Sequence, residues 1–164
     1  MEQNYGKKQI VLKARFLVAA QFLLLGLLIL KPKATVLLAP SWAPTLALVI
    51  NIFAAVILFM AWYALRASLQ ISPIPKDGAA LVTTGIYRFT RHPMYIGVLL
   101  FGASFVLTNI NLASILIWVA LLATLIFKAR FEDSLLLIKH THASEYQSKT
   151  MGLMGKKWRD ELDG

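Results

Sequence analysis

Residues 93–127 read PMYIGVLLFGASFVLTNINLASILIWVALLATLIF, and this stretch decides the fold. It is apolar almost throughout and is interrupted at residues 108–111 by an Asn-rich sequence that favours a turn. A single helix of this length would rise about 50 Å, whereas the hydrocarbon core of a bilayer is about 30 Å thick. The stretch therefore predicts a helical hairpin with arms at 93–107 and 112–127, and one long bent helix is the alternative.

Two further apolar segments precede this hairpin, at residues 14–30 and 44–65. The first is short for a span and needs flanking residues or local bilayer thinning to cross the membrane. The second is long enough and has one polar interruption, Asn51, for which we expect an interhelical hydrogen bond. The predicted fold class is therefore an all-α, polytopic integral membrane protein with about four transmembrane helices in a single domain, residues 1–164.

The composition agrees with this fold class. The chain is 58% hydrophobic and 15% charged, against about 25% charged residues in soluble domains. Because the chain contains no cysteine, disulfides, zinc ribbons and thiolate catalysis are excluded.

The positions of the basic residues predict the orientation in the membrane. Fifteen of the 17 lysines and arginines lie in the amino-terminal segment, in the loop before the hairpin or in the tail at 128–164. Four spans put these three segments on one side of the membrane, and only Lys31 and Lys33 lie on the opposite side. Cytoplasmic loops carry the excess of Lys and Arg, so both termini are expected in the cytoplasm. Topology thus explains the net charge of +9, and no nucleic-acid partner is expected.

The tail has its own apolar pattern. Phe131, Leu135 and Ile138 are spaced as on one helix face. The pattern predicts that the fourth helix continues out of the membrane as a cytoplasmic helical tail that reaches about Thr150.

The hairpin brings a few polar residues together at the cytoplasmic surface. Arg91 and His92 precede its first arm, and Glu132 and Asp133 follow its second arm. Because the arms are antiparallel, these four residues are expected to meet, and Arg91 beside the helix that begins at Pro93 favours an anion. The alternative is that Arg91 and His92 only anchor the helix among lipid headgroups.

Two residues beyond Pro93 extend this cluster. Tyr95 lies three residues after His92, on the same helix face. Gly97 would allow a neighbouring helix or a ligand to approach the backbone closely.

The segment 81–97, LVTTGIYRFTRHPMYIG, is followed by the hairpin and then by Glu132-Asp133. In this order the residues resemble the isoprenylcysteine carboxyl methyltransferase family and its phospholipid N-methyltransferase relatives. The resemblance covers about residues 73–146, and the G-x-Y and R-H-P-x-Y-x-G patterns carry it. It implies an integral membrane enzyme that transfers a methyl group from S-adenosylmethionine and releases S-adenosylhomocysteine.

The resemblance also implies a set of site residues and partners. Arg91 and Glu132 would be catalytic, as positioning groups or as a base, and the tail would complete the cofactor pocket. No metal is expected, and the acceptor would be a lipophilic small molecule, a lipid or a prenylated substrate that reaches the site among membrane lipids. The residues expected to bind the cofactor are Tyr87, Arg91, His92, Tyr95, Gly97 and Glu132.

The tail departs from the family pattern, since Lys139 to His142 stand where Phe-Gly is expected and Lys149 stands at the second of two tyrosine positions, the first being Tyr146. The acceptor and the methylated atom therefore stay open. Two other functions also stay open. One is a nicotinamide-dependent membrane reductase of related architecture, although such enzymes are typically much larger than 164 residues. The other is a noncatalytic membrane scaffold, which would leave the polar motif at 85–97 unexplained.

Overall fold

A computed structural model of the chain describes residues 2–30, 40–66, 81–153 and 155. Lys31 and Lys33, which we expect on the side of the membrane opposite to the termini, lie outside the described residues. The described part contains isolated β-bridges but no longer strand. Its helices are α1 (Glu2–Leu30), α2 (Ala43–Leu65), the 3-10 helix η1 (Gly85–Arg88), α3 (Pro93–Thr108), α4 (Leu112–Lys139) and α5 (Ala143–Lys149).

Four of these helices are apolar enough for a membrane. Residues 8–30 of α1, all of α2 and all of α4 are long enough to cross a bilayer, and α3 is a shorter apolar helix of 16 residues. Large apolar side chains such as Leu23, Phe53 and Leu116 are exposed on the outside of the bundle. Such an apolar surface marks contact with lipid, so the predicted all-α, multi-pass membrane fold is confirmed.

The helix ends differ from the predictions at two places. The helix of the first span begins at Glu2, so residues before position 14 provide the length that the apolar segment lacks. The prediction of one helix as far as about Thr150 is wrong, because α4 ends at Lys139 and the backbone of His140 is extended. The chain then turns and forms α5, which contacts α4.

The predicted hairpin is confirmed. Helix α3 ends at Thr108 and α4 begins at Leu112. The side chain of Asn111 accepts a hydrogen bond of 3.0 Å from the backbone N–H of Ser114. Asn is a favoured N-cap residue because its side-chain oxygen satisfies a backbone donor that the first helical turn leaves unpaired.

Small residues join α2 to α3. Ala47, Ala54 and Ala61, seven residues apart on α2, are all buried, and such spacing keeps one stripe of a helix against its partner. The predicted interhelical bond of Asn51 is confirmed, because the hydroxyl of Ser104 donates a hydrogen bond of 2.7 Å to its side-chain oxygen. Both features fix how α2 and α3 align.

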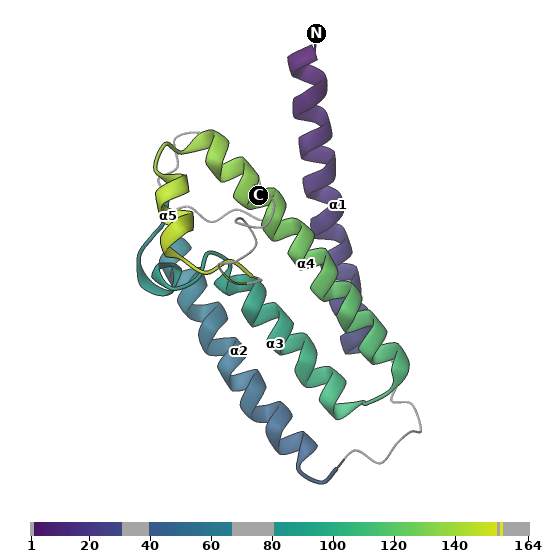
Figure 1. Cartoon of the computed structure of the whole chain (residues 1–164). Coiled ribbons are helices and arrows are strands. Elements are labelled where there is room, and N and C mark those ends of the chain that lie inside the picture. The colour runs from purple at the N-terminus through teal and green to yellow at the C-terminus, as the bar shows by residue number, and fades with distance from the viewer. Residues whose placement is uncertain (1, 31–39, 67–80, 154, 156–164) are drawn as a thin grey trace.

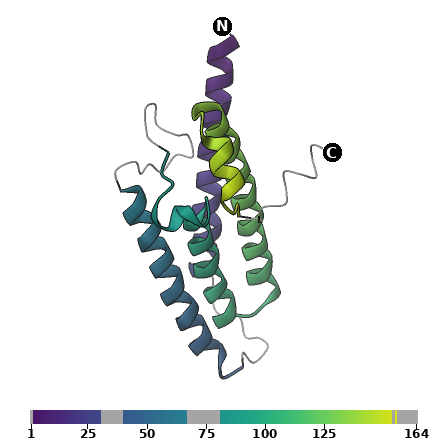
Figure 2. The same ribbon diagram turned by 60° about the vertical axis from the view of Figure 1, so that its left-hand side comes forward.

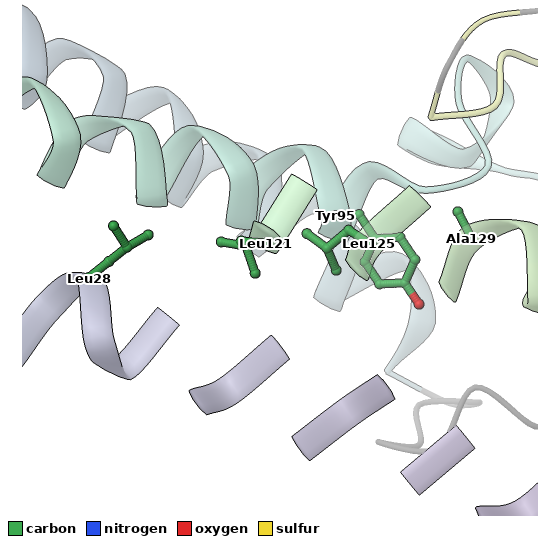
Figure 3. Close-up of a cluster of buried hydrophobic side chains, with 5 residues drawn as sticks. All are labelled: Leu28, Tyr95, Leu121, Leu125 and Ala129. Carbon is green, nitrogen blue, oxygen red and sulfur yellow. The ribbon is translucent and has the colours of Figure 1, made fainter. Parts of the chain in front are cut away.

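A second contact region, between α1, α3 and α4, forms the hydrophobic core. Its buried members are shown in Figure 3 and are Leu28, Tyr95, Leu121, Leu125 and Ala129. The three helices approach closely at Gly102, where a Cβ atom would lie 3.2–3.3 Å from side-chain atoms of Trp118, Leu121 and Leu28.

Figure 1 and Figure 2 show α3 between α2 and α4, and α1 contacts both α3 and α4. In Figure 1 the beginning of α3, the ends of α2 and α4, and α5 lie together at one end of the bundle. We call this the site end, because the polar residues singled out in the sequence lie on these elements.

Candidate functional site at the start of α3 and the end of α4

The approach to α3 is shaped by a tight turn. Gly85 has a φ of +61°, in the left-handed region that L side chains rarely adopt. It opens the 3-10 helix η1, after which the chain reaches Arg91 and His92 in non-helical conformations and enters α3 at Pro93. Proline suits this first helical position because its fixed φ matches the helix and it has no N–H to leave unpaired.

His92 lies between the two acidic residues of α4. Its side chain is buried, with Nε2 at 3.0 Å from Oδ1 of Asp133 and Nδ1 at 3.6 Å from Oε2 of Glu132. The prediction that His92 meets Glu132 and Asp133 across the hairpin is therefore confirmed.

Arg91 connects α4 to the segment that follows α5. Its Nη2 lies 3.2 Å from Oδ2 of Asp133, and its Nε donates to the same oxygen at 3.3 Å. Its Nη1 donates hydrogen bonds of 2.7 Å to the backbone carbonyls of both Gln147 and Thr150. The guanidinium thus joins Asp133 of α4 to the backbone of Gln147 and Thr150.

Backbone contacts strengthen this connection. The N–H of Arg91 donates to the carbonyl of Met151 at 2.9 Å, and the N–H of Met151 donates to the carbonyl of Phe89 at 3.1 Å. Gly152 follows, and a Cβ atom there would lie 2.6 Å from Nη2 of Arg91. Residues 143–153, which we call the closing segment, therefore lie directly against the Arg91–His92 motif.

Tyr95 lies one turn into α3 and is buried. Its ring stacks on that of His92, with centroids 5.3 Å apart and an interplanar angle of 3°. Its phenol is close enough to interact with the carboxylate of Glu132. The Nζ atom of Lys128 lies 4.9 Å from the centroid of the Tyr95 ring.

Tyr87 joins η1 to the closing segment. Its carbonyl accepts a hydrogen bond of 2.7 Å from the hydroxyl of Tyr146. Burial raises the pKa of Tyr87 well above its usual range, and the nearby charge of Glu132 raises it further. Burial also raises the pKa of Tyr146 to about 12, although the positive charge of Arg91 opposes the shift. Both phenols therefore stay protonated at neutral pH.

Gly97 lies apart from this cluster, where α3 packs against α2. A Cβ atom at this position would lie 2.7 Å from Cγ of Leu58 and 3.4 Å from the carbonyl oxygen of Ala54, both on α2. On a helix, two residues are about 200° apart, so Gly97 faces away from the side on which Tyr95 lies. The structure thus brings together five of the six predicted cofactor-binding residues and puts Gly97 at a helix crossing.

Some members of the site were not predicted. Gln147 donates from its side-chain amide to the carbonyl of Asp133 at 2.9 Å. Lys128, four residues before Glu132, is buried and donates to Gln21 of α1. The signal that points to Lys128 is a charged residue inside an apolar helix, since such residues are rare and are usually functional.

A cavity of about 70 Å³ opens between α4 and the closing segment. Charged and apolar side chains share its wall. The lining residues are Arg91, Ile126, Ala129, Arg130, Asp133, Gly152, Leu153 and Gly155.

Comparison with known proteins agrees with this geometry. The model of the isoprenylcysteine carboxyl methyltransferase (ICMT) family matches residues 45–138, which include most of α2, all of α3, the Arg91–His92 motif and both acidic residues of α4. No curated protein and no solved structure was found to match the chain. Because the family match covers more than half of the 164 residues, the chain belongs to the isoprenylcysteine carboxyl methyltransferase family.

Proposed function

We propose that this membrane protein is an S-adenosylmethionine-dependent methyltransferase with its cofactor site at the site end of α3 and α4. The observation that carries the proposal is the buried His92 ring between Glu132 and Asp133. Buried polar clusters of this kind are costly unless they are fully paired, and they are typical of functional sites.

The residues at the site suit the chemical groups of this cofactor. S-adenosylmethionine carries an ammonium group, a carboxylate, ribose hydroxyls and a sulfonium, and when bound it supplies an electrophilic methyl group. Asp133 already accepts from Arg91 and lies against His92, whereas Glu132 lies 3.6 Å from Nδ1 of His92, close to the phenol of Tyr95, and receives no guanidinium. Glu132 is therefore the carboxylate with the most capacity left to accept from an ammonium or a hydroxyl.

The remaining roles follow from charge and aromatic character. Arg91, His92 and the amino-terminal end of α3 offer hydrogen-bond donors that suit the cofactor's carboxylate. The aromatic faces of Tyr87 and Tyr95 suit a sulfonium or an adenine. We favour Tyr87 for this contact, because the Tyr95 ring already stacks on His92 and lies beside Lys128.

Catalysis in such a site consists mainly of positioning and of excluding water. A carboxylate acceptor needs no base, whereas an amine or hydroxyl acceptor must lose a proton, for which Glu132 and His92 are the nearest groups. Arg91 acts in this proposal by holding Asp133 and the closing segment in place.

We expect the closing segment to move when the cofactor binds. Small-molecule sites usually have volumes of about 300–1,000 Å³, and the cavity beside Asp133 holds about 70 Å³. Release of the Arg91 bonds to Gln147 and Thr150 would let the closing segment, with α5, move away from Arg91 and widen this cavity.

We propose a lipophilic acceptor that diffuses within the bilayer and reaches the site between the helices.

The proposal also puts both termini in the cytoplasm, where a soluble cofactor reaches the site end. Because the chain has no cysteine, single cysteines test the orientation. An impermeant maleimide applied to intact cells should label Ser41→Cys, before α2, and should leave Ser148→Cys in α5 unlabelled. The reverse pattern would contradict the orientation.

The central experiment is isothermal titration of the full-length protein in nanodiscs with S-adenosylhomocysteine. We expect binding by the wild type, loss of binding in Glu132→Gln and His92→Ala, and wild-type binding in Glu145→Gln. Glu145 is a suitable control because it is exposed and pairs with Lys149 in α5. If the wild type binds NADPH and not S-adenosylhomocysteine, the reductase takes the place of the methyltransferase. If the wild type binds neither ligand, a noncatalytic membrane scaffold is the function that remains.

A further inference from the structure

A charged residue is buried between α1 and α4. Lys128 is 6% exposed, and its Nζ donates a hydrogen bond of 2.8 Å to Oε1 of Gln21, which is 7% exposed. Gln21 belongs to α1 and lies outside residues 45–138, which the family model matches. The segment before the matched region thus contributes a polar group to the interior of the bundle.

The Lys128 ammonium is also in contact with the candidate site. It lies 4.9 Å from the centroid of the Tyr95 ring, a distance at which a cation is attracted to an aromatic face. Its positive charge interacts with the carboxylate of Glu132, one helical turn further along α4. Contacts therefore lead from Gln21 through Lys128 to Tyr95, and the charge of Lys128 acts on Glu132.

Packing of α1 does not require this polar pair. Leu28 already joins α1 to α3 and α4 in the hydrophobic core, against Leu121 and close to Gly102. A buried charge is expensive to desolvate, and an apolar pair of similar volume generally stabilises a fold as well or better. A buried Lys–Gln pair next to the site therefore points to a role in the site.

We propose that Lys128, held by Gln21, is a positioning residue that keeps the Tyr95 ring and the Glu132 carboxylate in the arrangement that binds the cofactor. This inference rests on the proposed function. It makes α1 a part of the functional unit, although the family match leaves this helix out.

The test compares the affinities of full-length variants for S-adenosylhomocysteine in nanodiscs. We expect Lys128→Met to raise the Kd by about tenfold or more, the equivalent of one lost charged hydrogen bond. Lys128→Arg keeps the cation and should stay within about threefold of the wild type, a difference below 1 kcal/mol. Leu28→Ala is the matched control, since it weakens the packing of α1 at an apolar contact and should lower the melting temperature without changing the Kd.

The outcomes separate positioning from general packing. A wild-type Kd in Lys128→Met, or equal losses of affinity in Lys128→Met and Leu28→Ala at equal melting temperatures, would overturn the inference and leave the proposed function intact. If Lys128→Met does not fold, Gln21→Leu and Gln21→Glu replace it. The leucine releases the ammonium and should raise the Kd, whereas the glutamate still accepts its hydrogen bond and should not. If the wild type itself fails to bind, the proposed function fails and the inference with it.

Discussion

Nε2 of His92 lies 3.0 Å from Oδ1 of Asp133, and the other oxygen of the same carboxylate receives the guanidinium of Arg91. One acidic side chain on α4 therefore holds the beginning of α3 directly. Through Arg91 it also holds the closing segment.

Removal of this carboxylate should destabilise the protein. Asp133→Ala leaves a buried imidazole and a guanidinium without their main partner, and we expect a loss of about 2–4 kcal/mol in the free energy of unfolding. Thermal unfolding in detergent measures the loss. Glu145→Ala removes an exposed carboxylate, paired with Lys149, and should leave the melting temperature unchanged. Equal drops in both variants would contradict the role of Asp133.

Gly152 should be intolerant of a side chain. The Cβ atom of Gly152→Ala would lie 2.6 Å from Nη2 of Arg91, and the arginine cannot move away without losing its bonds to Gln147 and Thr150. We expect the free energy of unfolding to fall by about 1–3 kcal/mol. We also expect faster proteolysis within residues 143–153. Gly26→Ala is the control, because nothing lies within 4 Å of that Cβ position and alanine favours a helix. Unchanged proteolysis of Gly152→Ala would argue against a tightly held closing segment.

Gly97 should be required by helix packing. In Gly97→Ala the new Cβ atom would lie 2.7 Å from Cγ and 2.8 Å from Cδ2 of Leu58, and such overpacking costs about 1–3 kcal/mol. The double variant Gly97→Ala/Leu58→Ala should recover part of the loss relative to Gly97→Ala alone, which a double-mutant cycle of melting temperatures would reveal. Strictly additive effects would show that the two residues do not interact.

Alkaline pH should weaken the fold through Tyr146. Its pKa is about 12 in the folded protein, against 10.0 for an ordinary tyrosine. Between these values the unfolded chain releases the phenolic proton and the folded protein keeps it, so stability falls as the pH rises through this window. Tyr146→Phe has no such proton and should show a shallower fall in melting temperature from pH 10 to 12. Parallel pH profiles for the two proteins would count against the raised pKa.

The sequence was sufficient to predict features that depend on connectivity. The polar residues at 108–111 located the hairpin, and the antiparallel arms then required His92 and Glu132 to meet. The same argument predicted a partner for Asn51, since an isolated amide inside an apolar helix needs one.

Other features depend on how far each helix is rotated about its axis and on where the backbone turns. The bond between Gln21 and Lys128 joins helices that are far apart in the sequence, and no spacing rule connects them. Arg91 binds carbonyl oxygens of Gln147 and Thr150, and every residue carries a carbonyl, so the acceptors have no signature in the sequence. The turn at His140 was missed because the apolar pattern of the tail continues to Ile138 with helical spacing.

The backbone bonds between Arg91 and Met151 have a consequence for truncation. A chain cut after α4 would keep the α3–α4 hairpin but would lack residues 147–152. The Nη1 group of Arg91 would then have no carbonyl acceptors, and one wall of the cavity would be missing. The site thus depends on residues that follow the helices of the hairpin.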